Sequence, residues 1–118
     1  MEKIIETRSK IAIFCKGQQI SPYKFNGFKE VNGYIIAYTS TSFTIFDSNG
    51  ITILSKKMVI NEFIYNGSFI VSKNNCKGIY RFDGKLIVPV EFFAFSITHT
   101  GIIEVQKEKD GTYEIYEK

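Results

Sequence analysis

The stretch of sequence that decides the fold is GIYRFDGKLIVPVEFFAFSITHTGIIEVQKEKDG, residues 78–111. It predicts a strand, a tight turn at Asp83-Gly84, a second apolar strand that ends at Pro89, an aromatic segment, a turn at Gly101 and a last alternating strand. Glycine is needed where the backbone takes a positive φ or where another segment approaches closely. We therefore interpret this stretch as one supersecondary unit of strands joined by tight turns.

The unit recurs along the chain with a period of about 34 residues, because eight of the nine glycines fall into three series with that spacing. The series are Gly33, Gly67 and Gly101; Gly17, Gly50 and Gly84; and Gly78 and Gly111. Periods of about 20 to 50 residues are typical of stacked supersecondary units. We predict a single domain, 1–118, with three repeats at approximately 11–43, 44–77 and 78–111 and a partial hairpin strand at each end.

Segments of strand length recur in step with the glycines. Two sets align, one at 3–7, 34–38, 68–73 and 102–107, and one at 11–17, 43–50, 79–84 and 112–118. Both faces of 11–15 and 43–46 are apolar, which predicts central strands there. The predicted fold class is all-β: an antiparallel meander of about three 34-residue β-hairpin repeats, arranged as an open twisted sheet, a sandwich or a barrel-like closure.

Three aromatic-rich segments, 22–32, 58–65 and 89–100, lie between these hairpins. We expect them to be mostly extended, with a single helical turn as the alternative, because an isolated helix of about eight residues is marginal. The strand pattern also predicts a set of core residues: Ile13, Phe14, Ile45, Phe46, Ile70, Ile79, Phe82, Val88 and Ile103.

The best-preserved copy of the unit, 78–111, resembles the bacterial WG repeat. The pattern is carried by Gly78, Asp83-Gly84-Lys85, Ile87-Val88-Pro89 and Phe92. The chain departs from the family in having no tryptophan, and Lys77 and Asp110 stand before Gly78 and Gly111. The resemblance covers nearly the whole chain and weakens toward the N-terminus. It implies a β-rich repeat module that presents a binding surface, and it brings no catalytic motif.

Length and composition exclude several classes of protein. At 118 residues and 44% hydrophobic residues, the chain is long enough for one domain with its own core. It has no run of about 18 apolar residues and no apolar signal region near its start, so we expect no membrane span and a cytoplasmic location. Cys15 and Cys76 are expected as free thiols, with a disulfide between them as the alternative.

The sequence lacks the groups of side chains that catalysis or metal binding needs. His99, the single histidine, has no nucleophile or carboxylate beside it in the chain, so we expect an exposed turn residue. One histidine and two distant cysteines do not match the spacing of zinc ligands. Asp47, Asp83 and Asp110 are expected to bond the backbone of turns. We therefore predict no enzyme activity, no metal site and no cofactor.

Positive charge gathers in the middle of a chain whose net charge is only +3. The segment 48–82 holds a single acid, Glu62, and five cations: Lys56, Lys57, Lys73, Lys77 and Arg81. Cations among aromatic side chains are typical of surfaces that hold a nucleic-acid backbone and stack its bases. A nucleic-acid-binding β domain that uses this basic centre is therefore the alternative function.

The preferred function is protein binding. The chain holds eleven Phe and seven Tyr, and the repeat aligns aromatic residues along one side, where Tyr65 and Tyr23 are the predicted anchors. A bias to Ile, Phe, Tyr, Lys and Asn is also typical of AT-rich bacterial and phage genomes. We predict a non-catalytic protein-binding module, without a prediction of its oligomeric state. Its most specific form is a small phage or mobile-element inhibitor, such as an anti-CRISPR protein, that covers a host defence nuclease.

Overall fold

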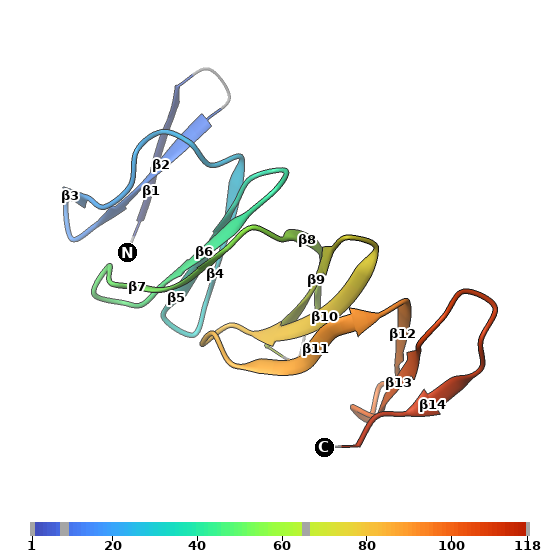
Figure 1. Cartoon of the computed structure of the whole chain (residues 1–118). Helices are drawn as coiled ribbons and strands as arrows, with labels where there is room; N and C mark the ends of the chain where they lie inside the picture. Colours follow the sequence, from blue (N-terminus) through green and yellow to red (C-terminus); the bar gives the residue numbers. More distant parts are fainter. Residues whose placement is uncertain (1, 8–9, 65–66, 118) are drawn as a thin grey trace.

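The computed structural model is an elongated stack of four small antiparallel sheets, 49 × 26 × 20 Å overall (Figure 1). It describes residues 2–7, 10–64 and 67–117. These residues form strands, turns and short connections and contain no helix, so the prediction of an all-β fold is confirmed. The three aromatic-rich segments are also mostly extended where they are described, without the helical turn that was their alternative.

Each sheet is a short meander in which consecutive strands pair. The first contains β1 (Glu2–Thr7), β2 (Lys10–Cys15) and β3 (Gln18–Gln19). The second contains β4 (Gly27–Val31), β5 (Tyr34–Tyr38), β6 (Phe43–Phe46) and β7 (Thr52–Lys56). The third contains β8 (Val59–Ile64), β9 (Ser68–Lys73), β10 (Cys76–Arg81) and β11 (Leu86–Phe92). The fourth contains β12 (Ala94–Ile97), β13 (Ile103–Gln106) and β14 (Tyr113–Ile115).

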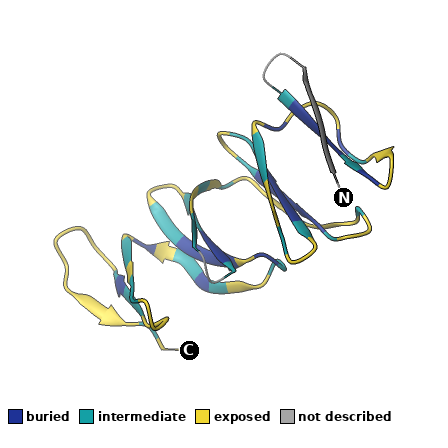
Figure 2. Ribbon diagram, turned by 180° about the vertical axis from the view of Figure 1, so that it is seen from behind, coloured by how far each residue is buried: buried dark blue, intermediate teal, exposed yellow. Residues whose placement is uncertain are grey.

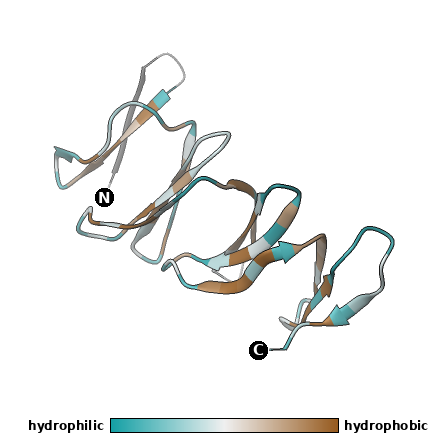
Figure 3. Cartoon of the chain, viewed as in Figure 1, coloured by the Kyte–Doolittle hydropathy of each residue, from teal (hydrophilic) through white to brown (hydrophobic). Residues whose placement is uncertain are grey.

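The meander is interrupted after β3, β7 and β11, where the chain leaves one sheet and begins the next. The sheets then pack face to face, in four layers. This arrangement gives the molecule three separate cores, one in each space between neighbouring sheets. Figure 2 shows the buried residues on the strands that face these spaces, and Figure 3 shows that the hydrophobic residues concentrate there.

Strands in the middle of the stack are apolar on both faces because each face meets a different core. On β5, Ile35 and Ala37 pack into the core between the first and second sheets, whereas Ile36 packs into the core between the second and third. Successive residues of a strand point to opposite faces, so one strand supplies two cores. All four residues of β6 are buried for the same reason, as the sequence predicted for a central strand.

The core prediction is confirmed for six residues and wrong in degree for three. Phe14, Ile70 and Ile103 are only half-buried. Ile70 and Ile103 pack at the rim of the core between the third and fourth sheets. Phe14 alternates with Ile13 on β2 and therefore lies on the opposite face of the first sheet, away from the neighbouring core.

The sequence predicted that the second strand of the 78–111 unit ends at Pro89, and this prediction is wrong. Strand β11 continues through the proline to Phe92. Proline has no N–H to donate, and it is tolerated in edge strands and bulges. β11 is an edge strand, and its register against β10 shifts twice, between Lys77 and Ile79 and between Ile79 and Tyr80.

Two of the three glycine series mark turns with positive φ, as predicted, whereas Gly78 of the third series lies within β10. Gly33, Gly67 and Gly101 have φ values of 85°, 92° and 92°, which are equivalent left-handed conformations. The Asn32-Gly33 turn has positive φ at both residues, which is the type I′ geometry that joins two strands tightly. The Gly67 and Gly101 N–H groups each donate to the carbonyl three residues earlier, Ile64 at 3.3 Å and Thr98 at 2.9 Å.

Replacing Gly67 by valine is expected to destabilise the protein by about 1–3 kcal/mol, because a β-branched residue is strained at positive φ. The space itself is adequate, since a Cβ at this position would lie 3.8 Å from the Phe82 ring. Chemical denaturation measures the loss. Gly67→Asn is the control, because asparagine tolerates this conformation and should cost much less. Equal losses in the two variants would contradict the conformational explanation.

Candidate functional site

Exposed apolar residues gather along one long side of the stack. Nine large hydrophobic side chains are exposed among the described residues, and five of them lie on β7, β11 and β14 or directly before β7. These five are Ile51, Ile53, Leu86, Tyr113 and Ile115. In Figure 1 these strands follow one another along the same edge of successive sheets. We call this surface the edge side. Exposed apolar patches mark interaction sites, so the edge side is the candidate binding site among the described residues.

The edge side is continuous because the sheets touch along it. The turn before β11 packs on β7, so a Cβ at Gly84 would lie 3.0 Å from Cγ2 of Ile53. The Phe92 ring at the end of β11 meets the Tyr116 ring after β14, with 5.8 Å between centroids. A partner that contacts one sheet on this side therefore reaches the neighbouring sheet without a gap in the surface.

Bulges shape the edge side. Phe46 lies opposite Thr52 and Ile45 lies opposite Leu54, which leaves Ile53 as the extra residue of β7. The register of β11 shifts in the same way at Ile87, between the pairs Ile79–Val88 and Tyr80–Leu86. Bulges on edge strands redirect side chains and limit uncontrolled pairing with other chains. β14 shows no such shift in its pairing with β13.

The structure divides the basic centre that the sequence predicted. Lys73 and Lys77 lie beside the turn between β9 and β10, and Lys56 and Lys57 lie at the corresponding end of the second sheet. Arg81 lies at the other end of β10, four residues and therefore about 13 Å along the strand from Lys77. The four lysines form one group, and Arg81 belongs to a different surface.

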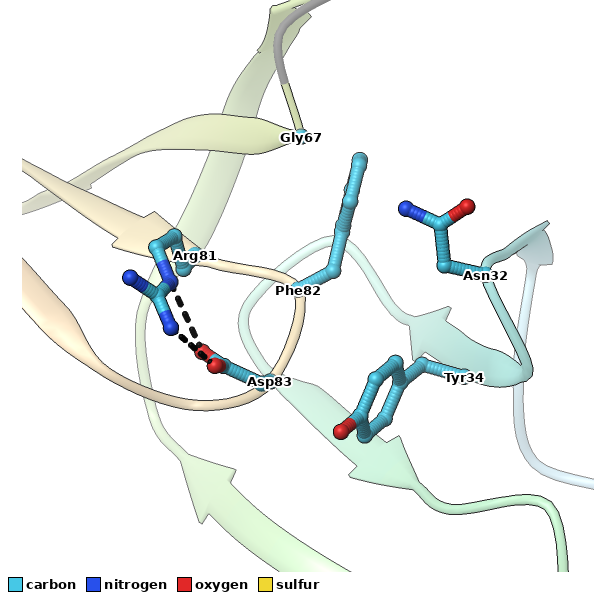
Figure 4. A pocket seen from close by; sticks show the side chains of 6 residues that line it. All are labelled: Asn32, Tyr34, Gly67, Arg81, Phe82 and Asp83. Atoms are coloured by element: carbon cyan, nitrogen blue, oxygen red, sulfur yellow. Dashed lines mark hydrogen bonds and ion pairs between the residues drawn. The ribbon is translucent and has the colours of Figure 1, made fainter.

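Arg81 forms an ion pair in a cleft between the second and third sheets (Figure 4). The cleft has a volume of about 270 Å³ and is lined by Asn32, Tyr34, Gly67, Arg81, Phe82 and Asp83. Arg81 Nε donates to Asp83 Oδ1 at 3.2 Å, and its Nη2 donates to Asp83 Oδ2. This hydrogen bonding raises the pKa of Arg81 and lowers that of Asp83. The charge of Arg81 is thus largely compensated inside its own turn.

A second groove lies next to Lys77. It has a volume of about 420 Å³ and is lined by Ser72, Asn75, Lys77, Phe93 and Ala94. Phe93 is one of the exposed large hydrophobic residues. A cation, an amide and an exposed ring around one groove are groups that can contact a phosphate and a base.

Of the two predicted aromatic anchors, the structure describes Tyr23 but not Tyr65. Tyr23 is 38% exposed and lies in the connection between β3 and β4. Its neighbour Lys24 places its ammonium 5.2 Å from the centre of the Phe25 ring. Tyr65 lies outside the described residues, so its role as an anchor stays a prediction. Tyr23 is far in the chain from the five residues of the edge side and is not one of them.

The expected bonding of turn backbone is confirmed for Asp47 and Asp83, and the expected free thiols are confirmed for both cysteines. Asp47 Oδ1 accepts hydrogen bonds from the N–H groups of Asn49 and Ile51, both at 2.9 Å, and Asp83 Oδ1 accepts one from Lys85 N–H at 3.1 Å. His99 is an exposed turn residue. Both cysteines are free, Cys15 buried and Cys76 half-buried.

Within 2–7, 10–64 and 67–117, no three histidine, cysteine or acidic residues group closely enough to hold a metal ion. The same residues include no helix of the length and hydropathy that crossing a bilayer requires.

The chain matches no protein-family model, no curated protein and no solved structure. The candidate site therefore rests on geometry. Sequence reasoning missed the edge side because Ile51, Ile53 and Leu86 belong to apolar strands whose exposure depends on how the sheets stack. Their position after the turn glycines Gly50 and Gly84 was the available signal, because it repeats in two units.

Proposed function

We propose that this chain is a non-catalytic protein-binding module that contacts its partner along the edge side. The proposal is carried by one observation: exposed aliphatic and aromatic side chains gather on β7, β11 and β14, along the length of a narrow molecule. Apolar residues at the centre of an interface, with a polar rim, are the usual source of binding energy between proteins. Lys56, Lys85 and Glu114 supply polar groups beside the apolar residues.

The proposal predicts that a double variant, Ile53→Lys with Leu86→Lys, loses its partner. Burying two lysines in an apolar contact without partners for their charges is costly, so we expect capture from cells of the native host to fall at least about tenfold. Capture is quantified by mass spectrometry with the chain as bait.

Val59→Lys is the matched control, since Val59 is also exposed but lies on β8, at the opposite edge of the third sheet. Circular dichroism checks that all variants fold. Retained capture by the double variant, or equal loss in the control, would remove the edge side as the interface.

In its more specific form we propose a small phage or mobile-element inhibitor, of the anti-CRISPR type, that covers a host defence nuclease. A narrow, elongated stack with a continuous contact surface suits a protein that acts by covering another. Adding the chain to the purified nuclease tests this form: stoichiometric loss of cleavage is expected, and unchanged cleavage at excess inhibitor would contradict it. The resemblance to WG repeats is likewise a proposal, supported by the equivalent φ values of the spaced glycines.

A second candidate function, nucleic-acid binding, is favoured by the groove beside Lys77. Lys77 lines this groove together with Asn75 and the exposed ring of Phe93, and Lys73 lies at the same turn between β9 and β10. The remaining predicted cations contribute unequally: Lys56 and Lys57 lie at the corresponding end of the second sheet, whereas Arg81 forms an ion pair with Asp83. Any nucleic-acid contact is therefore proposed for the lysine group alone.

Salt dependence separates the two functions. Nucleic-acid binding by several lysines releases counterions, so its affinity falls steeply between about 50 and 200 mM salt. We expect the chain to show no submicromolar binding of single-stranded DNA or RNA at the lower salt in fluorescence anisotropy. Tight, salt-sensitive binding that disappears in Lys73→Glu with Lys77→Glu would establish the alternative and contradict the preferred function.

A further inference from the structure

We propose that the open edge of β14 binds an extended, lysine-containing aliphatic segment of a partner protein, which pairs with β14 as a fourth, antiparallel strand of the last sheet. The inference rests on the proposed function and deepens it, because it names the kind of segment that the edge side takes. Addition of a strand to a sheet edge gives affinity through the backbone and specificity through alternate side chains.

The last sheet differs from the two sheets before it in the pairing of its third strand. In the second and third sheets, β6 and β10 have a partner on each side. In the part of the chain that the structure describes, β14 pairs only with β13, and all three of its residues are exposed, with Ile115 at 62%. Figure 2 shows β14 as an exposed strand at the end of the stack.

The free edge of β14 presents backbone groups in a defined order. Tyr116 N–H donates to the Ile103 carbonyl at 2.8 Å, in line with the register in which Ile115 lies opposite Glu104. Residues of an antiparallel strand alternate in the direction of their N–H and C=O groups. The backbone N–H and C=O groups of Tyr116 and Glu114 point toward β13. Those of Tyr113 and Ile115 therefore point away from β13, toward the position of a further strand.

The molecule contains its own examples of what pairs at this position. β7, in the sequence ITILSK (51–56), pairs antiparallel with β6, and β11, in KLIVPV (85–90), pairs antiparallel with β10. Both strands are largely aliphatic and have a lysine at one end, Lys56 as the last residue of β7 and Lys85 directly before β11. The outer edge of β14 offers the same strand geometry to a partner segment of the same composition, because no described residue pairs with that edge.

The charges around β14 favour a basic partner. A groove of about 310 Å³ runs between the end of β11 and β14, and it is lined by Glu91, Phe92, Val105, Lys107, Glu114, Ile115, Tyr116 and Glu117. Three carboxylates therefore face one ammonium group, and the Lys107 Nζ to Glu114 Oε2 distance is 3.9 Å between two exposed side chains. The apolar side chains of a partner strand meet Phe92 and Tyr116, while its lysines meet the surplus carboxylates.

The probe is a fluorescein-labelled peptide with the sequence of residues 50–58, GITILSKKM, titrated with the full chain and followed by anisotropy. We expect saturable binding, and at least about a tenfold weaker affinity when both lysines of the peptide are replaced by glutamate. Absence of saturable binding overturns the proposal. Equal affinity of the lysine and glutamate peptides also overturns it, because the acidic groove would then play no part.

Methylated peptides test the strand pairing without altering the protein. N-methylation at alternate residues removes one set of outward N–H groups, and methylation in the other phase removes the opposite set. We expect one phase to lose binding at least about tenfold and the other to keep it, because only one edge of an added strand faces β14. Equal effects of the two phases would mean that the peptide does not bind as a strand.

Variants of the chain locate the peptide. Glu114→Lys with Glu117→Lys is expected to weaken binding at least about tenfold, and Glu108→Lys, an exposed acid in the preceding turn, is the matched control with little effect. Sedimentation equilibrium tests whether a second copy of the chain occupies the edge of β14. A dimer that the peptide dissociates would overturn the proposal that a separate partner protein binds there. If the peptide fails but Ile53→Lys with Leu86→Lys still abolishes capture, the strand inference fails and the proposed function stands.

Discussion

Phe69→Ala is expected to destabilise the protein by about 3–5 kcal/mol, among the largest losses for any single truncation in this fold. Phe69 has no exposed surface. Its ring lies 5.2 Å from Phe43 across the space between the second and third sheets, and within about 6 Å of three rings of its own sheet, Phe63, Tyr80 and Phe82. Truncation leaves a cavity in the core that holds the two four-stranded sheets together.

Chemical denaturation measures this loss, with Phe93→Ala as the control. Phe93 is 40% exposed and contributes to none of the three cores, so its truncation should cost less than about 1 kcal/mol. A loss below about 1 kcal/mol for Phe69→Ala would contradict the packing of the second sheet on the third.

Gly78→Ala is expected to cost about 3 kcal/mol, at the upper end for overpacking, because the added methyl group meets backbone. A Cβ at Gly78 would lie 2.7 Å from the Val88 carbonyl oxygen and 2.8 Å from the Val90 Cα. Neither atom moves without separating β11 from β10. The position is on a strand and not in a turn, so the glycine is required here for close approach of two strands.

Gly27→Ala is the matched control for this prediction. The three atoms nearest to a Cβ at Gly27 would all belong to the Tyr38 side chain, with 2.5 Å to its hydroxyl oxygen. A side chain can rotate away where a backbone cannot, so thermal or chemical denaturation should show a clearly smaller loss for Gly27→Ala. A smaller loss for Gly78→Ala than for Gly27→Ala would show that β11 does not lie against β10 as described.

The turns could be predicted from the sequence because their cause is local. Gly33, Gly67 and Gly101 recur at a fixed spacing, and each has the positive φ that glycine takes without strain. The turn at Asn74-Asn75 has positive φ at both residues, a conformation that asparagine tolerates. The all-β class follows from the same short spacing of turns and apolar segments.

The separation into four sheets could not be predicted, because it depends on contacts between distant residues. Alternation along β5 shows that both faces are apolar, yet it does not show that Ile35 and Ile36 enter two different cores. Phe43 and Phe69 were therefore missed as core residues. Phe14 was over-predicted because it lies on the face of the first sheet opposite to Ile13, and that face borders none of the three cores.

The candidate site was only partly visible in the sequence. The lysines of the basic centre are exposed or half-exposed as expected of polar residues, but Arg81 lies at the opposite end of β10 from Lys77 and forms an ion pair with Asp83. Ile53 is exposed because a bulge makes it the extra residue of β7. A bulge is set by the pairing of two strands, and nothing in the isolated sequence of β7 marks it.

Hydrogen exchange of the chain bound to its captured partner tests the central claim most directly. Slowed exchange reports amides that binding covers or pairs. We predict that protection appears in 51–56, 85–92 and 113–117, the segments of the edge side, and that the lysine-bearing turn at 73–77 exchanges as in the free chain. Protection confined to 73–77 and the neighbouring Phe93, with the edge strands unchanged, would contradict the account.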